Sequence, residues 1–115
     1  TTDSVGNASE RLKIMGDGRG LSQFTAKAWC AYETIGTQSI IDSHNISSIS
    51  DQGVGESLLF FSNNMANADY AAFASTNTNS NKVIDTLASS VQTRMVDQNN
   101  TSEDRTYASV TVFGD

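Results

Sequence analysis

Apolar and polar residues alternate in steps of two along several short stretches of this chain, which is the period of a β-strand with one buried face. Residues 26–33 (AKAWCAYE) and residues 105–113 (RTYASVTVF) alternate most cleanly. Polar turns separate them from further predicted strands near residues 39–43 and 69–75. The pattern therefore predicts several short antiparallel strands.

Residues 47–62 (SSISDQGVGESLLFFS) predict a hairpin, because Gly53 and Gly55 suit the positive φ angles of a short connection. Four large apolar residues then follow in succession at positions 58–61. Successive strand residues point to opposite faces, so this strand is predicted to be apolar on both faces. A chain of this length has one interior, and we expect a neighbouring copy of the chain to cover the second face.

Two segments depart from the simple alternation. Ile46 and Ile49 are three residues apart, which predicts a bulge or a corner. Residues 82–96 fit either a helix or a strand, since their apolar residues recur at helical spacing while Ser and Thr between them are weak helix formers. We predict a strand from about Ser89 onward and leave residues 83–87 open between helix and strand.

The composition supports an all-β domain. Ser, Thr and Asn make up 38 of the 115 residues, and these residues favour turns and exposed sheet faces over helix interiors. We predict one antiparallel β-sandwich or jelly roll over residues 26–115, preceded by an N-terminal arm over residues 1–25. The side chains expected to seed the core are Trp29, Phe60, Phe61, Phe73 and Phe113.

The arm has two interpretations. Leu12 and Ile14 share one face of a short predicted strand, and glycines follow at positions 16, 18 and 20. A single short strand has no core of its own, so it must lie on something else. Either the arm is ordered against the domain, or it is the last turn of an intertwined fibre stalk.

The net charge and the cysteine content restrict the classes of partner and of metal site that the chain is expected to have. The formal net charge of −6 disfavours nucleic acid and anionic membrane surfaces as partners. The single Cys30 excludes an internal disulfide, and no Cys or His cluster suggests zinc. We expect no metal and no cofactor.

Catalytic signals are weak. Asp42, Ser43 and His44 are adjacent, whereas the members of a hydrolase triad converge from separate elements. Three copies of His44 on a threefold axis could hold a metal, although an ordinary surface or interface histidine is the simpler interpretation. We expect no enzymatic activity.

Two polar loops are the candidate binding surfaces. Residues 77–81 and 98–104 offer amide and hydroxyl groups on connections, where recognition tends to reside. The alternative is that they are merely solvated. Tyr70 and Tyr107 could add an aromatic platform for sugars, but both also fit a core pattern. The receptor-binding candidates are Asn77, Asn79, Asn81, Asn99, Asn100 and Glu103.

Several segments resemble a known family. Residues 9–20 (SERLKIMGDGRG) resemble the segment in which bacteriophage tail-fibre stalks approach their C-terminal heads, and residues 28–61 resemble the heads of marine phage and cyanophage fibres. The stretch NNMANADY and the terminal VTVFGD match later parts of the same pattern. Leu59 and Phe61 make one strand more apolar than is usual in the family, and Ala66 stands where a proline is common.

The resemblance implies a homotrimeric virion protein with a β-sandwich head on a short stalk. It implies attachment to other virion proteins through the N-terminal arm, and binding of a host-surface glycan or protein by the head. The expected trimer-interface residues are Leu12, Ile14, Leu59 and Phe61. The alternative function is a structural fibre or decoration protein of the capsid or tail with no receptor-binding role.

Overall fold

The computed structural model describes residues 13–16, 25–77 and 80–114, which contain eight β-strands and no helix. The strands are β1 (Ala26–Glu33), β2 (Ser39–His44), β3 (Ile46–Gly53), β4 (Glu56–Phe61), β5 (Ala71–Thr76), β6 (Ser80–Leu87), β7 (Ser90–Val96) and β8 (Ala108–Phe113). The all-β prediction is confirmed. Among the described residues, no helix is available that could cross a membrane.

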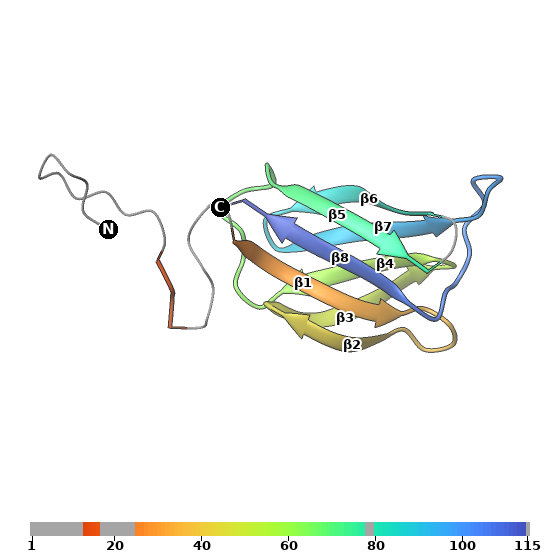
Figure 1. The fold of residues 1–115 in the computed structure, drawn as a ribbon, viewed down its shortest axis with the longest axis horizontal. Helices are drawn as coiled ribbons and strands as arrows, with labels where there is room; N and C mark the ends of the chain where they lie inside the picture. Colours follow the sequence, from red (N-terminus) through yellow and green to blue (C-terminus); the bar gives the residue numbers. More distant parts are fainter. Residues whose placement is uncertain (1–12, 17–24, 78–79, 115) are drawn as a thin grey trace, which may run out of the picture.

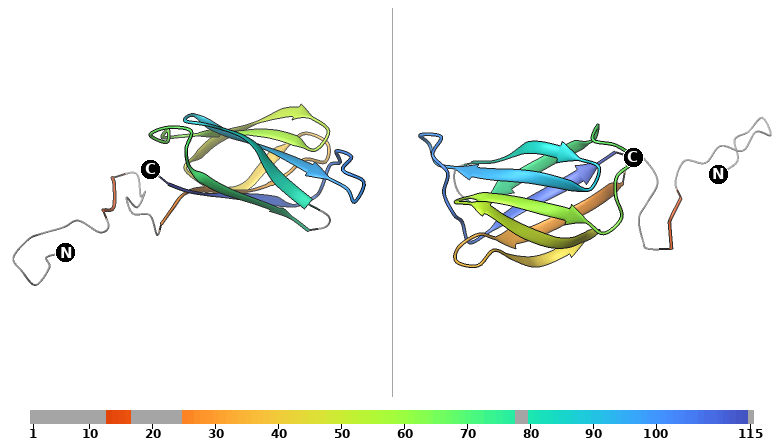
Figure 2. Two further views of the ribbon diagram at one scale, coloured as in Figure 1. Left: turned by 90° about the horizontal axis from the view of Figure 1, so that it is seen from above. Right: turned by 180° about the vertical axis from the view of Figure 1, so that it is seen from behind.

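The strands form two four-stranded antiparallel sheets that face each other as a sandwich (Figures 1 and 2). We call the sheet of order β2-β1-β8-β5 the front sheet and the sheet of order β3-β4-β7-β6 the back sheet. Consecutive strands pair within one sheet at β1–β2, β3–β4 and β6–β7. The predicted sandwich is confirmed, but its order differs from a jelly roll, in which most successive strands change sheets.

The interior is built from the inward residues of both sheets, as the alternation predicted. The front sheet contributes Ala28, Cys30 and Tyr32 from β1 together with the alanine and valines of β8, all at most 1% exposed. The back sheet contributes Leu59 and Val91, both fully buried, with their neighbours on β4 and β7. Burial of these side chains is the main force holding the sheets together, at roughly 1.5–3 kcal/mol for each valine and leucine and less for the alanines.

The predicted hairpin and bulge are both present. β3 and β4 pair across a short turn in which Gly53 has φ 130° and Gly55 has φ 71°. A Cβ atom on Gly55 would lie 2.4 Å from the carbonyl oxygen of Glu103, so glycine is required there by both backbone angle and space. The register between β3 and β4 shifts between Ile46 and Ser48, which accounts for the three-residue spacing of Ile46 and Ile49.

The open segment 83–87 is a strand. β6 runs through it and pairs with β7 in a hairpin. A register shift between Val83 and Asp85 interrupts the alternation and leaves Ile84 and Leu87 exposed, at 43% and 49%. This bulge explains why the apolar residues of the segment imitate helical spacing.

Strand β4 corrects the interface prediction. Leu59 is fully buried and Phe61 is 5% exposed, and both pack in the core of a single subunit because the front sheet covers that side of β4. The outward residues of the strand are Leu58 and Phe60, which are partly buried. Leu59 and Phe61 are therefore not available to a neighbouring copy, and the second apolar face of this strand is formed by Leu58 and Phe60.

The remaining predictions for the N-terminal arm and for the aromatic core residues have mixed outcomes. Ile14 is 65% exposed, whereas Leu12 lies outside the described residues. The division of the chain at residues 25 and 26 stays a prediction, although β1 begins at Ala26.

Of the aromatic residues expected in the core only Phe61 is buried there, because Trp29 and Phe73 occupy outward strand positions and are 38% and 64% exposed. Phe60 and Phe113 are partly buried.

Candidate functional site

The candidate site is the end of the sandwich at which β1 and β5 finish and β8 begins, which we call the loop end (Figure 1). The opposite end, where β1 begins and β8 finishes, is the terminal end. At the loop end the β1–β2 loop (34–38) and the β3–β4 turn (54–55) meet the long β7–β8 loop (97–107). The predicted receptor candidates come from the long loop and from the β5–β6 connection.

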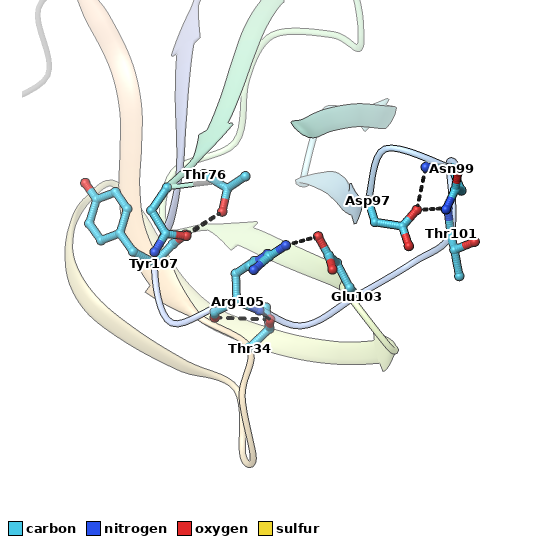
Figure 3. Close-up of polar contacts among 9 residues, drawn as sticks. Thr34, Thr76, Asp97, Asn99, Thr101, Glu103, Arg105 and Tyr107 are labelled. Atoms are coloured by element: carbon cyan, nitrogen blue, oxygen red, sulfur yellow. Dashed lines mark hydrogen bonds and ion pairs between the residues drawn. The ribbon is translucent and has the colours of Figure 1, made fainter. Parts of the chain in front are cut away.

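The long loop is fastened to the two neighbouring connections by hydrogen bonds. Thr34 and Arg105 bond reciprocally: the Thr34 N–H donates to the Arg105 carbonyl at 3.0 Å, and the Arg105 N–H donates to Thr34 Oγ1 at 2.9 Å. The Gly55 N–H donates to Asp104 Oδ1 at 2.7 Å. Figure 3 shows the contacts around Thr34 and Arg105 and the ion pair of Arg105 with Glu103. The loop is thereby tied to both sheets.

The tip of the long loop is organised by Asp97. Its carboxylate Oδ1 accepts the N–H groups of Asn99 at 2.8 Å and Thr101 at 3.0 Å (Figure 3). Asn100 adopts φ 62°, a left-handed angle that asparagine tolerates better than most residues. The sequence reasoning overlooked Asp97, although an Asp placed two residues before Asn at the start of a polar loop is a recognisable Asx-turn signal.

A buried polar network lies beneath these loops. The Tyr32 hydroxyl is 2.6 Å from Thr93 Oγ1, and it accepts the Asn81 side-chain N–H at 3.0 Å. Burial raises the pKa of Tyr32 above its ordinary value. Ser57 Oγ donates to Gln38 Oε1 at 2.7 Å in a second buried pair. These bonds join the front sheet and the β1–β2 loop to the back sheet at the loop end.

Asn81 does not fit its predicted role as a receptor-binding residue, because it is part of this buried network and is only 8% exposed. Its side-chain amide also donates to the Ser75 carbonyl at 3.2 Å, and its Oδ1 is buried with no hydrogen-bond partner in the described part of the chain. A receptor on the surface cannot reach this side chain. Asn81 follows the inward alternation of β6, in line with Val83, and therefore points into the sandwich.

The other receptor candidates divide by exposure. Asn77, Asn99 and Asn100 are exposed at the loop end. Asn100 Oδ1 accepts a hydrogen bond from Lys82 Nζ at 3.1 Å. Glu103 is ion-paired with Arg105 and is only partly exposed. Asn79 lies outside the described residues. The exposed amides of Asn77, Asn99 and Asn100 offer hydrogen-bond donors and acceptors to hydroxyl-rich ligands at the loop end.

A second feature was not predicted from the sequence. Trp29, Phe73 and Phe113 lie on the outward side of the front sheet, which we call the aromatic face. The sequence contained a signal for this face, because Trp29 alternates with Ala28 and Cys30, whose small side chains are buried. Of the tyrosines considered for a platform, Tyr107 is 45% exposed while Tyr70 packs against Phe61.

The described residues contain no group of three or more metal-ligating side chains. Ser43 pairs opposite the inward Cys30, whereas His44 pairs opposite the outward Trp29, so the two side chains belong to different faces of β2. Burial raises the pKa of the Cys30 thiol to about 12, which keeps it in the unreactive protonated form. No protein-family profile, curated protein or solved structure matches the chain.

Proposed function

We propose that this chain is the head of a bacteriophage tail fibre that binds a host-surface glycan or protein as a homotrimer. The observation that carries the proposal is the long β7–β8 loop, which is held by Asp97 and by the Thr34–Arg105 pair and presents the exposed amides of Asn99 and Asn100 at the end opposite that at which β1 begins. A head connected to its stalk at the terminal end would present the loop end to a cell. The proposed location is the virion, with other virion proteins contacting the N-terminal arm.

The chemistry of the loop end favours sugars as the ligand. Amide groups donate and accept hydrogen bonds, and sugar hydroxyls do both as well. The order imposed by Asp97 and by the Thr34–Arg105 pair lowers the conformational entropy lost on binding. A single small surface site of this kind is expected to bind with a Kd on the order of 1 mM, and three linked sites raise the avidity about 10²–10⁴-fold.

The test is binding of the full chain to an array of bacterial surface polysaccharides and lipopolysaccharide O-chains. A variant with Asn77→Ala and Asn99→Ala should lose binding while remaining folded. The matched control is Asn64→Ala, because Asn64 is the same residue type and is also exposed, on the β4–β5 connection at the terminal end.

Retained binding by the Asn77→Ala, Asn99→Ala variant would remove the loop end as the contact surface. A chain that binds neither the array nor intact bacterial cells would favour the alternative of a structural or decoration protein.

A further inference from the structure

Two cationic side chains meet the tip of the long loop on the outward side of the back sheet. Register places Lys82 of β6 opposite Arg94 of β7, so the two lie on the same face. Lys82 Nζ donates to Asn100 Oδ1 at 3.1 Å, and Arg94 Nε donates to Ser102 Oγ at 2.7 Å. We call Lys82, Arg94, Asn100 and Ser102 the donor cluster. It joins β6 and β7 to the loop that carries the candidate site.

The bonds within the donor cluster use its acceptors and leave donors for a ligand. An ammonium group can only donate, so the Asn100 atom beside Lys82 is the oxygen, and the Asn100 amino group faces away from that bond. Ser102 Oγ accepts from Arg94, which leaves its own hydrogen for donation. The terminal nitrogens of Arg94 make no hydrogen bond within the part of the chain that the structure describes.

The positive charge of the donor cluster is only partly compensated. Glu56 follows Arg94 in the register, and its Oε1 lies 3.8 Å from Arg94 Nε. Lys82 has no carboxylate within ion-pair distance among the described residues. Of the loop carboxylates, that of Asp97 accepts N–H groups of the loop tip and that of Glu103 is ion-paired. Like charges directly opposite each other destabilise a sheet, and an anion bound between Lys82 and Arg94 offsets that cost.

A ligand that matches these donors brings acceptors. A neutral hydroxyl both donates and accepts, whereas the oxygens of a carboxylate or a fully ionised phosphate only accept. Guanidinium and ammonium groups bind such oxygens through charge-assisted hydrogen bonds, which are about twice as strong as neutral ones. The donor cluster therefore favours an anionic oxygen group over a sugar hydroxyl.

We propose that the donor cluster binds a carboxylate or phosphate group of an acidic surface glycan. The proposal rests on the proposed function for the glycan, and it narrows the receptor to a polysaccharide that carries anionic groups. Lys82 and Arg94 supply the charge, and Asn100 and Ser102 add neutral donors from the loop. The exposed amide of Asn99, next in the chain to Asn100, contacts the neighbouring hydroxyls of the sugar.

The net charge of −6 weakens this contact without preventing it. Repulsion from the rest of the surface is screened beyond a Debye length of about 10 Å at 0.1 M salt, whereas the bound group touches the cluster directly. Because the cluster is exposed, water and salt also weaken the attraction. We expect a Kd on the order of 1 mM and an about 3–10-fold preference for the charged form of a ligand over its neutral form.

The test compares ligands that differ in charge. The full chain is titrated with trigalacturonic acid and with its methyl ester, and separately with the phosphate monoester of galactose and with galactose. Binding is followed by the amide NMR shifts of Asn100 and Ser102. We expect at least one charged ligand to bind about threefold or more tightly than its neutral counterpart, and the charged group that does so identifies a uronic acid or a phosphorylated sugar as the source. Raising the salt concentration from roughly 0.02 M to roughly 0.5 M should reduce the preference.

Charge variants assign the effect to the cluster. Lys82→Gln removes the charge but keeps an N–H donor, and it should weaken binding of the preferred charged ligand about 3–10-fold while leaving its neutral counterpart unchanged. The matched control is Lys13→Gln, which removes the same charge from an exposed lysine of the N-terminal arm, away from the loop end (Figure 1). Lys82→Glu keeps a charge on the edge strand β6, where charges protect against aggregation, and should abolish the preference.

Three results would overturn the proposal: equal affinity for the charged and neutral ligands in both pairs, equal losses in Lys82→Gln and Lys13→Gln, or shifts that leave Asn100 and Ser102 unaffected. The proposed function survives each of them if the polysaccharide array still shows binding that depends on the loop-end amides. Conversely, binding of trigalacturonic acid through Lys82 by a chain that binds no bacterial polysaccharide or cell would confirm the anion site and remove the receptor role.

Discussion

The two ends of the sandwich interior are closed by different kinds of contact. At the terminal end, Phe61 and Tyr70 pack edge to face with ring centroids 5.8 Å apart, and Met65 is buried beside them in the core. The Tyr70 hydroxyl lies 2.9 Å from the Leu87 carbonyl oxygen and 2.8 Å from that of Ser90, so it donates to backbone. At the loop end, the Tyr32 hydroxyl instead bonds to two side chains.

The contacts at the two ends have different consequences for the stability of the domain and for the geometry of the candidate-site loops. At the terminal end, Met65 and Tyr70 hold the β4–β5 connection on the core, and the Met65 N–H donates to the Ala88 carbonyl at 2.8 Å, so the loops that are fixed there lie away from the candidate site. The network at the loop end contains Gln38 of the β1–β2 loop and Asn81 at the start of β6, so it connects the core to the connections that carry the candidate site. We expect changes at the terminal end to lower stability most, and changes at the loop end to alter the loops as well.

The largest effect is expected at the terminal end. Phe61→Ala should lower the free energy of unfolding by about 3–5 kcal/mol, because it leaves a cavity in a packed core. Urea denaturation measures the loss, and amide NMR shifts of the long loop should stay unchanged. A loss below about 1 kcal/mol would show that the aromatic contact is not what closes this end.

The next effect is expected at the β3–β4 turn. Gly55→Ala forces a Cβ to 2.4 Å from the Glu103 carbonyl oxygen and 2.8 Å from that of Met95, and it adds strain at φ 71°. Gly36→Ala is the matched control, because its φ is 70° but nothing lies within 4 Å of its Cβ. We expect the control to lose about 1 kcal/mol and Gly55→Ala at least about 2 kcal/mol. Equal losses in urea denaturation would show that the long loop does not press on the turn.

The two tyrosine hydroxyls provide a direct comparison of the ends. Tyr32→Phe should cost about 1–3 kcal/mol, since it leaves Thr93 Oγ1 and the Asn81 amide without this buried partner. Tyr70→Phe should cost less, about 0.5–1.5 kcal/mol, because its site is partly exposed and water can reach the carbonyls. The reverse order in urea denaturation would contradict the assignment of the stronger polar network to the loop end.

The smallest effect is confined to alkaline pH. Burial raises the pKa of Cys30 from 9.0 to about 12 and that of Tyr70 from 10.0 to about 12. Both groups are protonated in the folded state at pH values where the unfolded chain loses its protons. Their contribution to stability is therefore complete below pH 9 and declines as the pH rises from 9 toward 12. Cys30→Ala should flatten this decline in the urea midpoint, and an unchanged slope would exclude Cys30 as a cause.

Much of the fold was predictable from local alternation. The predicted strand over residues 26–33 coincides with β1, and the predicted alternation over residues 105–113 placed Ala108, Val110 and Val112 together on one face of β8 without showing that this face is the buried one. The bulge at Val83–Asp85 was not predictable, because its spacing also fits a helix and only pairing with β7 resolves it. The exposed amides of the long loop are recognisable from the sequence as loop residues, whereas the polar run NTNSN does not reveal that β6 begins at Ser80 and turns Asn81 inward.

The sequence by itself determined that short strands alternate along the chain, because side-chain direction in a strand has a local period of two. Only the tertiary structure decided which face of each strand lies inside, since that depends on partner strands distant in sequence. Leu59 and Phe61 point inward because the front sheet covers that face of β4. Trp29 points outward because Ala28, Cys30 and Tyr32 occupy the inward side of β1, and Phe73 points outward because Ala72 and Ala74 occupy that of β5.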